Sequence, residues 1–157
     1  MKKWMAPVLA ILLLTACGSD KPVETPDVDL DDFYESLAKE YQWDNGYMVE
    51  VEDEQLNDWY PGLRDLHPEQ VEAHMPMMSS VVNEVVFVEC ETEQDAENAA
   101  GILQERIDLQ AEGGAWYPES MEAWRRGIVI QQGTYVAMIA SAEHQDEIAE
   151  AFTNLFL

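Results

Sequence analysis

The sequence predicts an α+β fold: a small, mostly antiparallel sheet of about three strands with helices packed on one face. A run of Val and Phe at 85–88 is typical of a strand. Two similar runs, at 128–131 and 135–140, flank a Gln132-Gly133 pair that supplies a tight hairpin turn. Apolar residues at helical spacing recur around these runs, which favours a sheet covered by helices.

Helices are predicted where apolar residues recur every three or four positions. Thr92 can cap the longest helix, with Asp95 completing a capping-box-like pair, and Gly113-Gly114 ends it. The other helical segments are a helix from Asp31 to Asn45-Gly46, one turn containing Leu56 and Trp59-Tyr60, a short helix at 119–126, and a final helix with its apolar stripe from Ile148 to Phe156.

Two segments are less regular. A short strand is expected at 47–51, and residues 67–78 remain ambiguous because Pro68 and Pro76 bracket a short helix at best. In the strand at 85–88, alternation places Val86, Val88 and Cys90 on one side and the other apolar residues on the opposite side.

The N-terminus carries the features of an export signal. Lys2 and Lys3 precede an apolar run, residues 4–14, that is too short to cross a bilayer as a stable helix. Residues 14–17, Leu-Thr-Ala-Cys, resemble the lipobox of bacterial lipoproteins. The resemblance implies cleavage before Cys17 and attachment of diacylglycerol to its sulfur, so that the membrane is a partner through this anchor.

Three regions follow from this interpretation. Residues 1–16 are the signal peptide, and residues 17–30 are the lipidated Cys and a polar, Pro-containing tether. Residues 31–157 form a single globular domain. We therefore expect a protein anchored at the extracytoplasmic face of the cell membrane.

The composition is strongly acidic, with 32 Asp and Glu against 8 Lys and Arg and a formal charge of −24. Loss of Lys2 and Lys3 with the signal lowers this to −26. Such a field excludes nucleic-acid binding and favours cationic partners or loosely bound divalent cations such as calcium. With Cys17 lipidated, Cys90 has no partner for an intramolecular disulfide, and we expect it to be a buried thiol.

No dedicated cofactor or metal site is expected. His67 and His74 lie seven positions apart, too distant on a helix to share a zinc ion, and His144 is expected at the surface. Asp27, Asp29 and Asp31 resemble the first ligands of a calcium loop, but Asp32 and Ala38 stand where Gly and Glu are required.

The sequence also lacks the common catalytic motifs, so the leading interpretation is a non-enzymatic binding module. The alternative is a cell-wall or glycan hydrolase that uses a carboxylate pair. Trp59-Tyr60 and Trp116-Tyr117 can present rings to a ligand, although each pair is expected to have one ring in the core and one at its rim. Arg125-Arg126 is expected to pair with neighbouring acids.

Several short motifs in the C-terminal half occur together with the strand at 85–89 and the Ala- and Glu-rich helix. They are Tyr117-Pro118-Glu119, Gly127-Ile128-Val129-Ile130 and Gln132-Gly133-Thr134-Tyr135-Val136. With the signal, they resemble bacterial lipoproteins that carry the domain of unknown function 4358, a clostridial type. The resemblance covers roughly residues 45–157 and implies a Gram-positive cell surface, but it brings no activity, cofactor or site residue.

Overall fold

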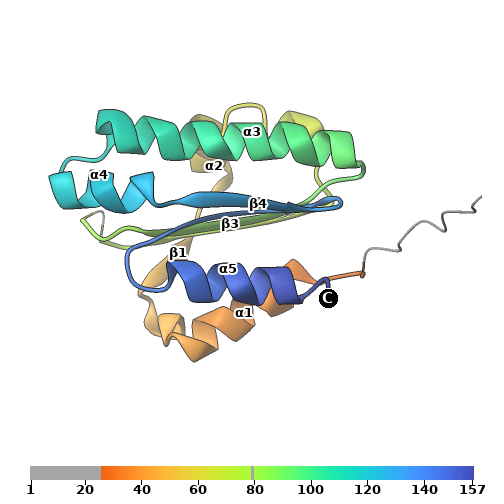
Figure 1. Cartoon of the computed structure of the whole chain (residues 1–157), viewed down its shortest axis with the longest axis horizontal. Helices are drawn as coiled ribbons and strands as arrows, with labels where there is room; N and C mark the ends of the chain where they lie inside the picture. The colour runs from red at the N-terminus through yellow and green to blue at the C-terminus, as the bar shows by residue number, and fades with distance from the viewer. Residues whose placement is uncertain (1–25, 79) are drawn as a thin grey trace, which may run out of the picture.

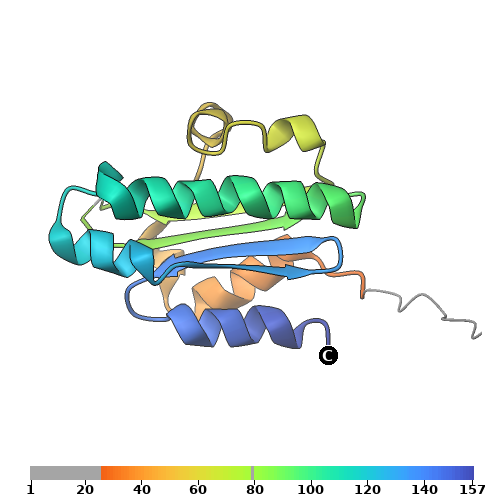
Figure 2. The same ribbon diagram turned by 45° about the horizontal axis from the view of Figure 1, so that its top comes forward.

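The computed structural model describes residues 26–78 and 80–157, which form a five-stranded antiparallel sheet between two layers of helices (Figures 1 and 2). The strand order is β1-β2-β3-β5-β4. The strands are β1 (Met48–Glu50), β2 (Gln70–Pro76), β3 (Asn83–Glu89), β4 (Ile128–Gln132) and β5 (Tyr135–Ser141). The helices are α1 (Leu30–Glu40), α2 (Asp53–Trp59), α3 (Glu93–Leu109), α4 (Pro118–Arg125) and α5 (Gln145–Asn154).

Helices cover both faces of the sheet, so the prediction of one covered face was wrong. Figure 1 shows α3 and α4 on one side of the strands and α1 and α5 on the other. The reason lies in the central strands: all seven residues of β5 and six of the seven in β3 are buried. A strand buried on both faces is apolar along its length rather than alternating. The mixed α+β class is confirmed, with five strands instead of about three.

The ambiguous segment at 67–78 contains β2, not a helix. Val71, Ala73 and Met75 pack on the α3 side of the sheet, and His74 on the α1 side stacks against Tyr34. This alternation has the period of a strand. Pro76 is the last residue of β2 and pairs with Met48 of the edge strand β1, a position where a missing N–H is tolerated.

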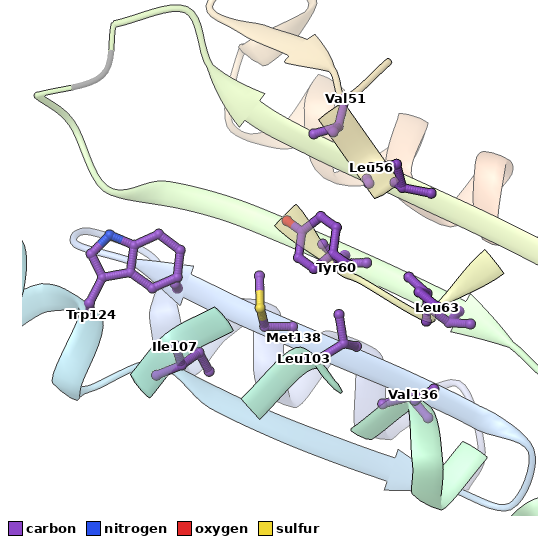
Figure 3. Close-up of a cluster of buried hydrophobic side chains, with 14 of the residues drawn as sticks. Val51, Leu56, Tyr60, Leu63, Leu103, Ile107, Trp124, Val136 and Met138 are labelled. Carbon is purple, nitrogen blue, oxygen red and sulfur yellow. The ribbon is translucent and has the colours of Figure 1, made fainter. Parts of the chain in front are cut away.

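Two separate cores stabilise the sheet. On the α3 side, Val86 and Val88 pack with a cluster that includes Tyr60, Leu103 and Met138 (Figure 3). On the α1 side, Phe33, Phe87 and Phe152 lie with ring centroids 5.0 to 6.1 Å apart. The predicted division of the 85–90 residues between the two faces is confirmed. Burial of these aromatic rings is a large contribution to the hydrophobic stabilisation.

The packed domain starts slightly before the expected boundary at residue 31. Val28 and Leu30 are buried, and Asp29 caps α1 by accepting a hydrogen bond from the Asp32 N–H at 3.0 Å. The Val28 N–H donates to Tyr135 Oη at 3.1 Å, and Gln70 Nε2 donates to the Val28 carbonyl at 2.9 Å. Asp29 is therefore the N-cap of α1.

These contacts define two ends of the sheet. The tether end contains Val28, Gln70 and Tyr135, while the far end contains Asn83 and Ser141, which are paired across β3 and β5. The predicted signal peptide at residues 1–16, Cys17 and the predicted tether up to residue 25 lie outside the described residues. Within the described ranges, no helix combines the length and apolar character needed to span a membrane.

Candidate functional site

A pocket of about 600 Å³ opens at the far end of the sheet. We call it the end pocket. Three chain segments converge there: the loop between α1 and β1, the residues that lead into β3, and the loop between β5 and α5. The side chains that matter for its chemistry are Tyr41, Trp43, Tyr47, Asn83, Glu143 and His144. Its volume lies in the usual range for small-molecule sites.

The first of these loops has a constrained backbone. Gln42 adopts a left-handed conformation with φ of 60°, and Gly46 has φ of 85°. A residue other than glycine in this region costs on the order of 1–3 kcal/mol, and such strain is concentrated at functional sites. Asn45 accepts a hydrogen bond from the Tyr47 N–H at 3.2 Å, which fixes the chain as it enters β1.

The opposite wall is fixed by backbone and side-chain hydrogen bonds. The Ala142 N–H donates to the Val82 carbonyl at 2.8 Å, which joins the loop after β5 to the segment before β3. Gln145 accepts from the Ser141 N–H at 3.0 Å and donates to the Ile139 carbonyl at 2.9 Å. These hydrogen bonds fix the conformation of the loop between β5 and α5.

A row of stacked rings supports one side of the end pocket. His144 stacks on Tyr41 with centroids 4.2 Å apart, and Tyr41 lies 5.2 Å from Trp43. Trp43 stacks on Tyr34, and Tyr34 stacks on His74 at 3.4 Å. Burial, followed by the charge of Glu72, raises the pKa of Tyr34 to about 12, so this phenol is neutral at physiological pH.

The structure separates the three histidines. His74 is buried and its Nε2 lies 3.0 Å from Glu72 Oε2, while His67 is exposed. His144, expected at the surface, is instead partly covered by its stacking on Tyr41. Within the described residues, no three His, Cys, Asp or Glu side chains are grouped as metal ligands.

Asn83 is the most unusual polar residue of the end pocket. Its side chain is 4% exposed, and its Nδ2 donates to Met48 Sδ at 3.3 Å. Its carbonyl oxygen, Oδ1, accepts no hydrogen bond from any described protein group. Burial raises the pKa of Tyr47, a side-chain hydrogen bond with Asn83 lowers it, and the charge of Glu143 raises it again. Sequence reasoning missed Asn83, although an Asn that opens an otherwise apolar strand is a usable signal.

On the other face of the sheet, Glu84 forms a buried ion pair with Arg106 of α3. Arg106 Nε and Nη2 donate to the two carboxylate oxygens, each at 2.9 Å. Tyr60 Oη donates to Glu84 Oε1 as well. The guanidinium lies over the rings of Trp59, Tyr60 and Trp124 at 4.7, 5.9 and 5.5 Å. Sequence reasoning missed both charged residues, because they stand within apolar patterns that predict only a strand and a helix.

This ion pair bears on the carboxylate-pair alternative. Glu84 is 5% exposed and is the one buried carboxylate in the described part of the chain. Both its oxygens accept hydrogen bonds from Arg106, and burial of Tyr60, reinforced by Glu84, raises the pKa of that phenol well above its ordinary value. The pair resembles a structural, charge-assisted contact more than two facing carboxylates.

The two aromatic pairs differ. Tyr60 is in the core and Trp59 lies at its rim, which confirms the expectation for that pair. Trp116 and Tyr117 are 92% and 57% exposed, so the same expectation was wrong for them. They lie in the connection between α3 and α4, after the Gly113-Gly114 turn. Arg125 pairs with Glu122 at 3.1 Å, as expected, whereas Arg126 forms no ion pair within the described residues.

Acidic side chains dominate the surface, because cationic residues are few and most of them are paired. The described part of the chain contains five Lys and Arg residues. Arg64 pairs with Asp53, Arg106 with Glu84 and Arg125 with Glu122. None of the residues that line the end pocket is a Lys or Arg. The pocket therefore lies in a negative field that its own lining does not offset.

Comparison with known proteins assigns a family but no activity. No curated protein and no solved structure matches the chain. The family described as Domain of unknown function (DUF4358) matches residues 41–141, which run from the first ring of the end pocket to the last residue of β5. This match covers more than half of the sequence, and the chain belongs to the DUF4358 family.

Proposed function

We propose that the mature protein is a lipid-anchored binding domain on the extracytoplasmic face of the cell membrane, and that its ligand lies in the end pocket. The observation that carries this proposal is the position of the pocket. The chain enters the domain at Val28, at the tether end, while Asn83 and Ser141 line the pocket at the opposite end. An anchor on Cys17 therefore leaves the pocket directed away from the lipid.

The distance to the membrane supports this orientation. The segment from Cys17 to Val28 spans at most about 40 Å when fully extended. The acidic domain is repelled by anionic lipid headgroups, which favours standing off the surface at the end of the tether. Exposed Met77 and Met78 also lie at the far end, next to the segment that leads into β3. A partner therefore meets the pocket and these side chains first.

The anchor is tested by changing each cysteine in turn. Cys17→Ser should leave unprocessed precursor or released protein, because the sulfur that carries the lipid is gone. Cys90→Ala is the matched control and should stay in the membrane fraction. Fractionation of a Gram-positive host, with protease added to intact cells, measures attachment and sidedness. Normal processing and unchanged attachment of Cys17→Ser would contradict the proposal.

The pocket is tested without assuming a ligand. The purified domain, labelled with nitrogen-15, is titrated with a library of small fragments, and binding should shift the amide signals of the far end. Glu143→Trp places a large side chain at the exposed rim and should abolish those shifts. Glu69→Trp, also exposed but at the tether end, should leave them unchanged. Shifts scattered over the surface, or none, would contradict a ligand site here.

The hydrolase alternative predicts a different outcome. Turnover of a cell-wall or glycan substrate by the purified domain, abolished by Glu84→Gln while the fold is retained, would replace binding with catalysis. The bidentate contact of Glu84 with Arg106 favours the opposite result, because that carboxylate is already engaged.

A further inference from the structure

We propose that the ligand of the end pocket carries a protonated primary amine on an apolar chain. This inference deepens the proposed function and rests on it, because it assumes that the pocket is the ligand site. It follows from three features of the lining: an acceptor without a partner, an excess of acceptors without cationic residues, and aromatic walls.

The first feature is the Asn83 carbonyl oxygen. Oδ1 is buried and accepts no hydrogen bond from the described protein groups, while Nδ2 is already directed at Met48 Sδ. An unsatisfied buried acceptor costs about 1–3 kcal/mol. A ligand N–H recovers that cost, and an ammonium N–H forms a charge-assisted bond that is about twice as strong as a neutral one.

The second feature is the sign of the surrounding groups. Glu143 contributes a carboxylate at the rim, and Tyr47 contributes a phenol hydroxyl to the lining. No Lys or Arg lines the pocket. A carboxylate or phosphate ligand would therefore face repulsion from Glu143 with no Lys or Arg in the lining to offset it, whereas an ammonium group meets acceptors and a negative field.

The third feature is the remainder of the wall. Trp43, Tyr47 and Val81 supply the apolar surface against which an alkyl chain can pack. Tyr41 stacks on His144 and packs at a tilt against Trp43, and these contacts hold the wall in place before any ligand arrives. A preformed wall reduces the entropy that binding must offset.

A free amine and a lysine side chain of a partner protein both supply this chemistry. The experiment therefore compares two amine probes, 1-aminopentane and Nα-acetyl-lysine methylamide. Tighter binding of the lysine derivative assigns the source to a protein, and equal or tighter binding of 1-aminopentane assigns it to a small molecule. Either result supports a primary-amine site.

Isothermal titration at constant ionic strength then compares 1-aminopentane with three probes of similar size. They are 1-pentanol, which is neutral, pentanoate, which is anionic, and tetramethylammonium, which is cationic but has no N–H. We expect 1-aminopentane to bind about tenfold more tightly than 1-pentanol, the difference that one charge-assisted hydrogen bond provides. Pentanoate should not bind. Equal affinity for 1-pentanol and 1-aminopentane would overturn the inference.

Variants separate a site from a general attraction of cations to an acidic protein. Asn83→Leu keeps the size of the side chain and the net charge but removes Oδ1. It should therefore lower the affinity for 1-aminopentane about tenfold and leave the affinity for tetramethylammonium unchanged. Glu143→Gln should lower the affinity for both cations. Glu69→Gln, which removes the same charge at the tether end, should lower neither affinity. Equal effects of Glu143→Gln and Glu69→Gln would show a diffuse field and overturn the inference.

The outcomes also separate this inference from the proposed function. If fragments bind in the end pocket but amines show no preference over 1-pentanol, the amine assignment is wrong and the binding site stands. If neither fragments nor amines bind there, both proposals fail. Thermal unfolding of Asn83→Leu shows whether the variant is folded, and Glu143→Gln, at an exposed position, tests the charge independently of that result.

Discussion

Asn83 and Glu84 are consecutive residues of β3 and serve opposite faces of the sheet. Asn83 lies in the end pocket beside Met48, and Glu84 lies under α3 with Arg106 and Tyr60. This follows from the alternation of side chains along a strand. The proposed ligand site and the buried ion pair are therefore neighbours in sequence but are separated by the sheet, so substitutions can address them independently.

Arg106→Met should destabilise the domain by about 3–5 kcal/mol, because it leaves the Glu84 carboxylate buried without its counter-charge. The aliphatic part of Met retains some packing against Trp59 and Trp124, so most of the loss reflects the unpaired charge. Urea unfolding followed by tryptophan fluorescence measures it. Amine binding at the end pocket should persist wherever the variant is folded.

The double variant Glu84→Gln/Arg106→Met is the matched control. It removes both charges and leaves a neutral amide beside Tyr60, so it should be more stable than Arg106→Met alone. If the loss of unfolding free energy in the double variant equals the sum of the losses in the two single variants, the two charges do not stabilise each other.

Much of the fold was predictable because local patterns and tertiary packing agree. Thr92 accepts from the Asp95 N–H at 3.1 Å and Gly113 ends the helical segment with φ of 133°, as the sequence indicates. The sequence did not predict the correct number of strands or the helices on the second face of the sheet. The consecutive apolar residues of β3 signal burial on two faces, but α1 and α5 were assigned no separate layer, and the alternation in β2 was obscured by Pro68 and Pro76.

The site was less predictable than the fold. The aromatic residues of the end pocket come from separate segments, and only the chain trace brings Tyr41 beside His144 and Tyr34 beside His74. Asn83 is a candidate site residue because its Oδ1 has no hydrogen-bond partner among the described groups. This property arises from the packing and cannot be read from the sequence.

Gly133→Val should destabilise the domain by about 1–3 kcal/mol. Gly133 and Thr134 form the turn between β4 and β5, one residue later than the predicted Gln132-Gly133 pair, and Gly133 has φ of 60°. A β-branched side chain is strained in that conformation. The thermal midpoint measures the effect, with Gly133→Asn as a milder control because Asn tolerates this region. Equal midpoints for Val and the wild type would contradict the turn geometry.

Cys90 should react slowly with a thiol reagent in the folded protein and quickly after denaturation. It is buried in the α3-side core, and burial, with smaller contributions from Asp95 and Glu89, raises the pKa of its thiol to about 11. The reactive thiolate is therefore scarce at neutral pH and also inaccessible. Labelling is followed with and without urea at pH 7. Rapid labelling of the native domain would show an accessible, activated thiol instead.

The stability of the domain should depend on ionic strength because of its excess of acidic groups. Repulsion among surface carboxylates weakens the fold at low salt, and screening relieves it. We therefore expect the thermal midpoint to rise with sodium chloride. The buried pair of Glu84 and Arg106 is shielded from solvent, so screening should weaken it much less than it relieves the surface.

Calcium should raise the midpoint further than sodium at the same ionic strength, because a divalent ion can bridge neighbouring surface carboxylates without a dedicated loop. Glu84→Gln serves as an internal control: it lowers the midpoint through the buried pair but should leave the calcium increment intact. The measurement is a thermal unfolding series in sodium, magnesium and calcium chloride at matched ionic strength. Identical midpoints in all three salts would leave screening as the sole effect and contradict bound calcium.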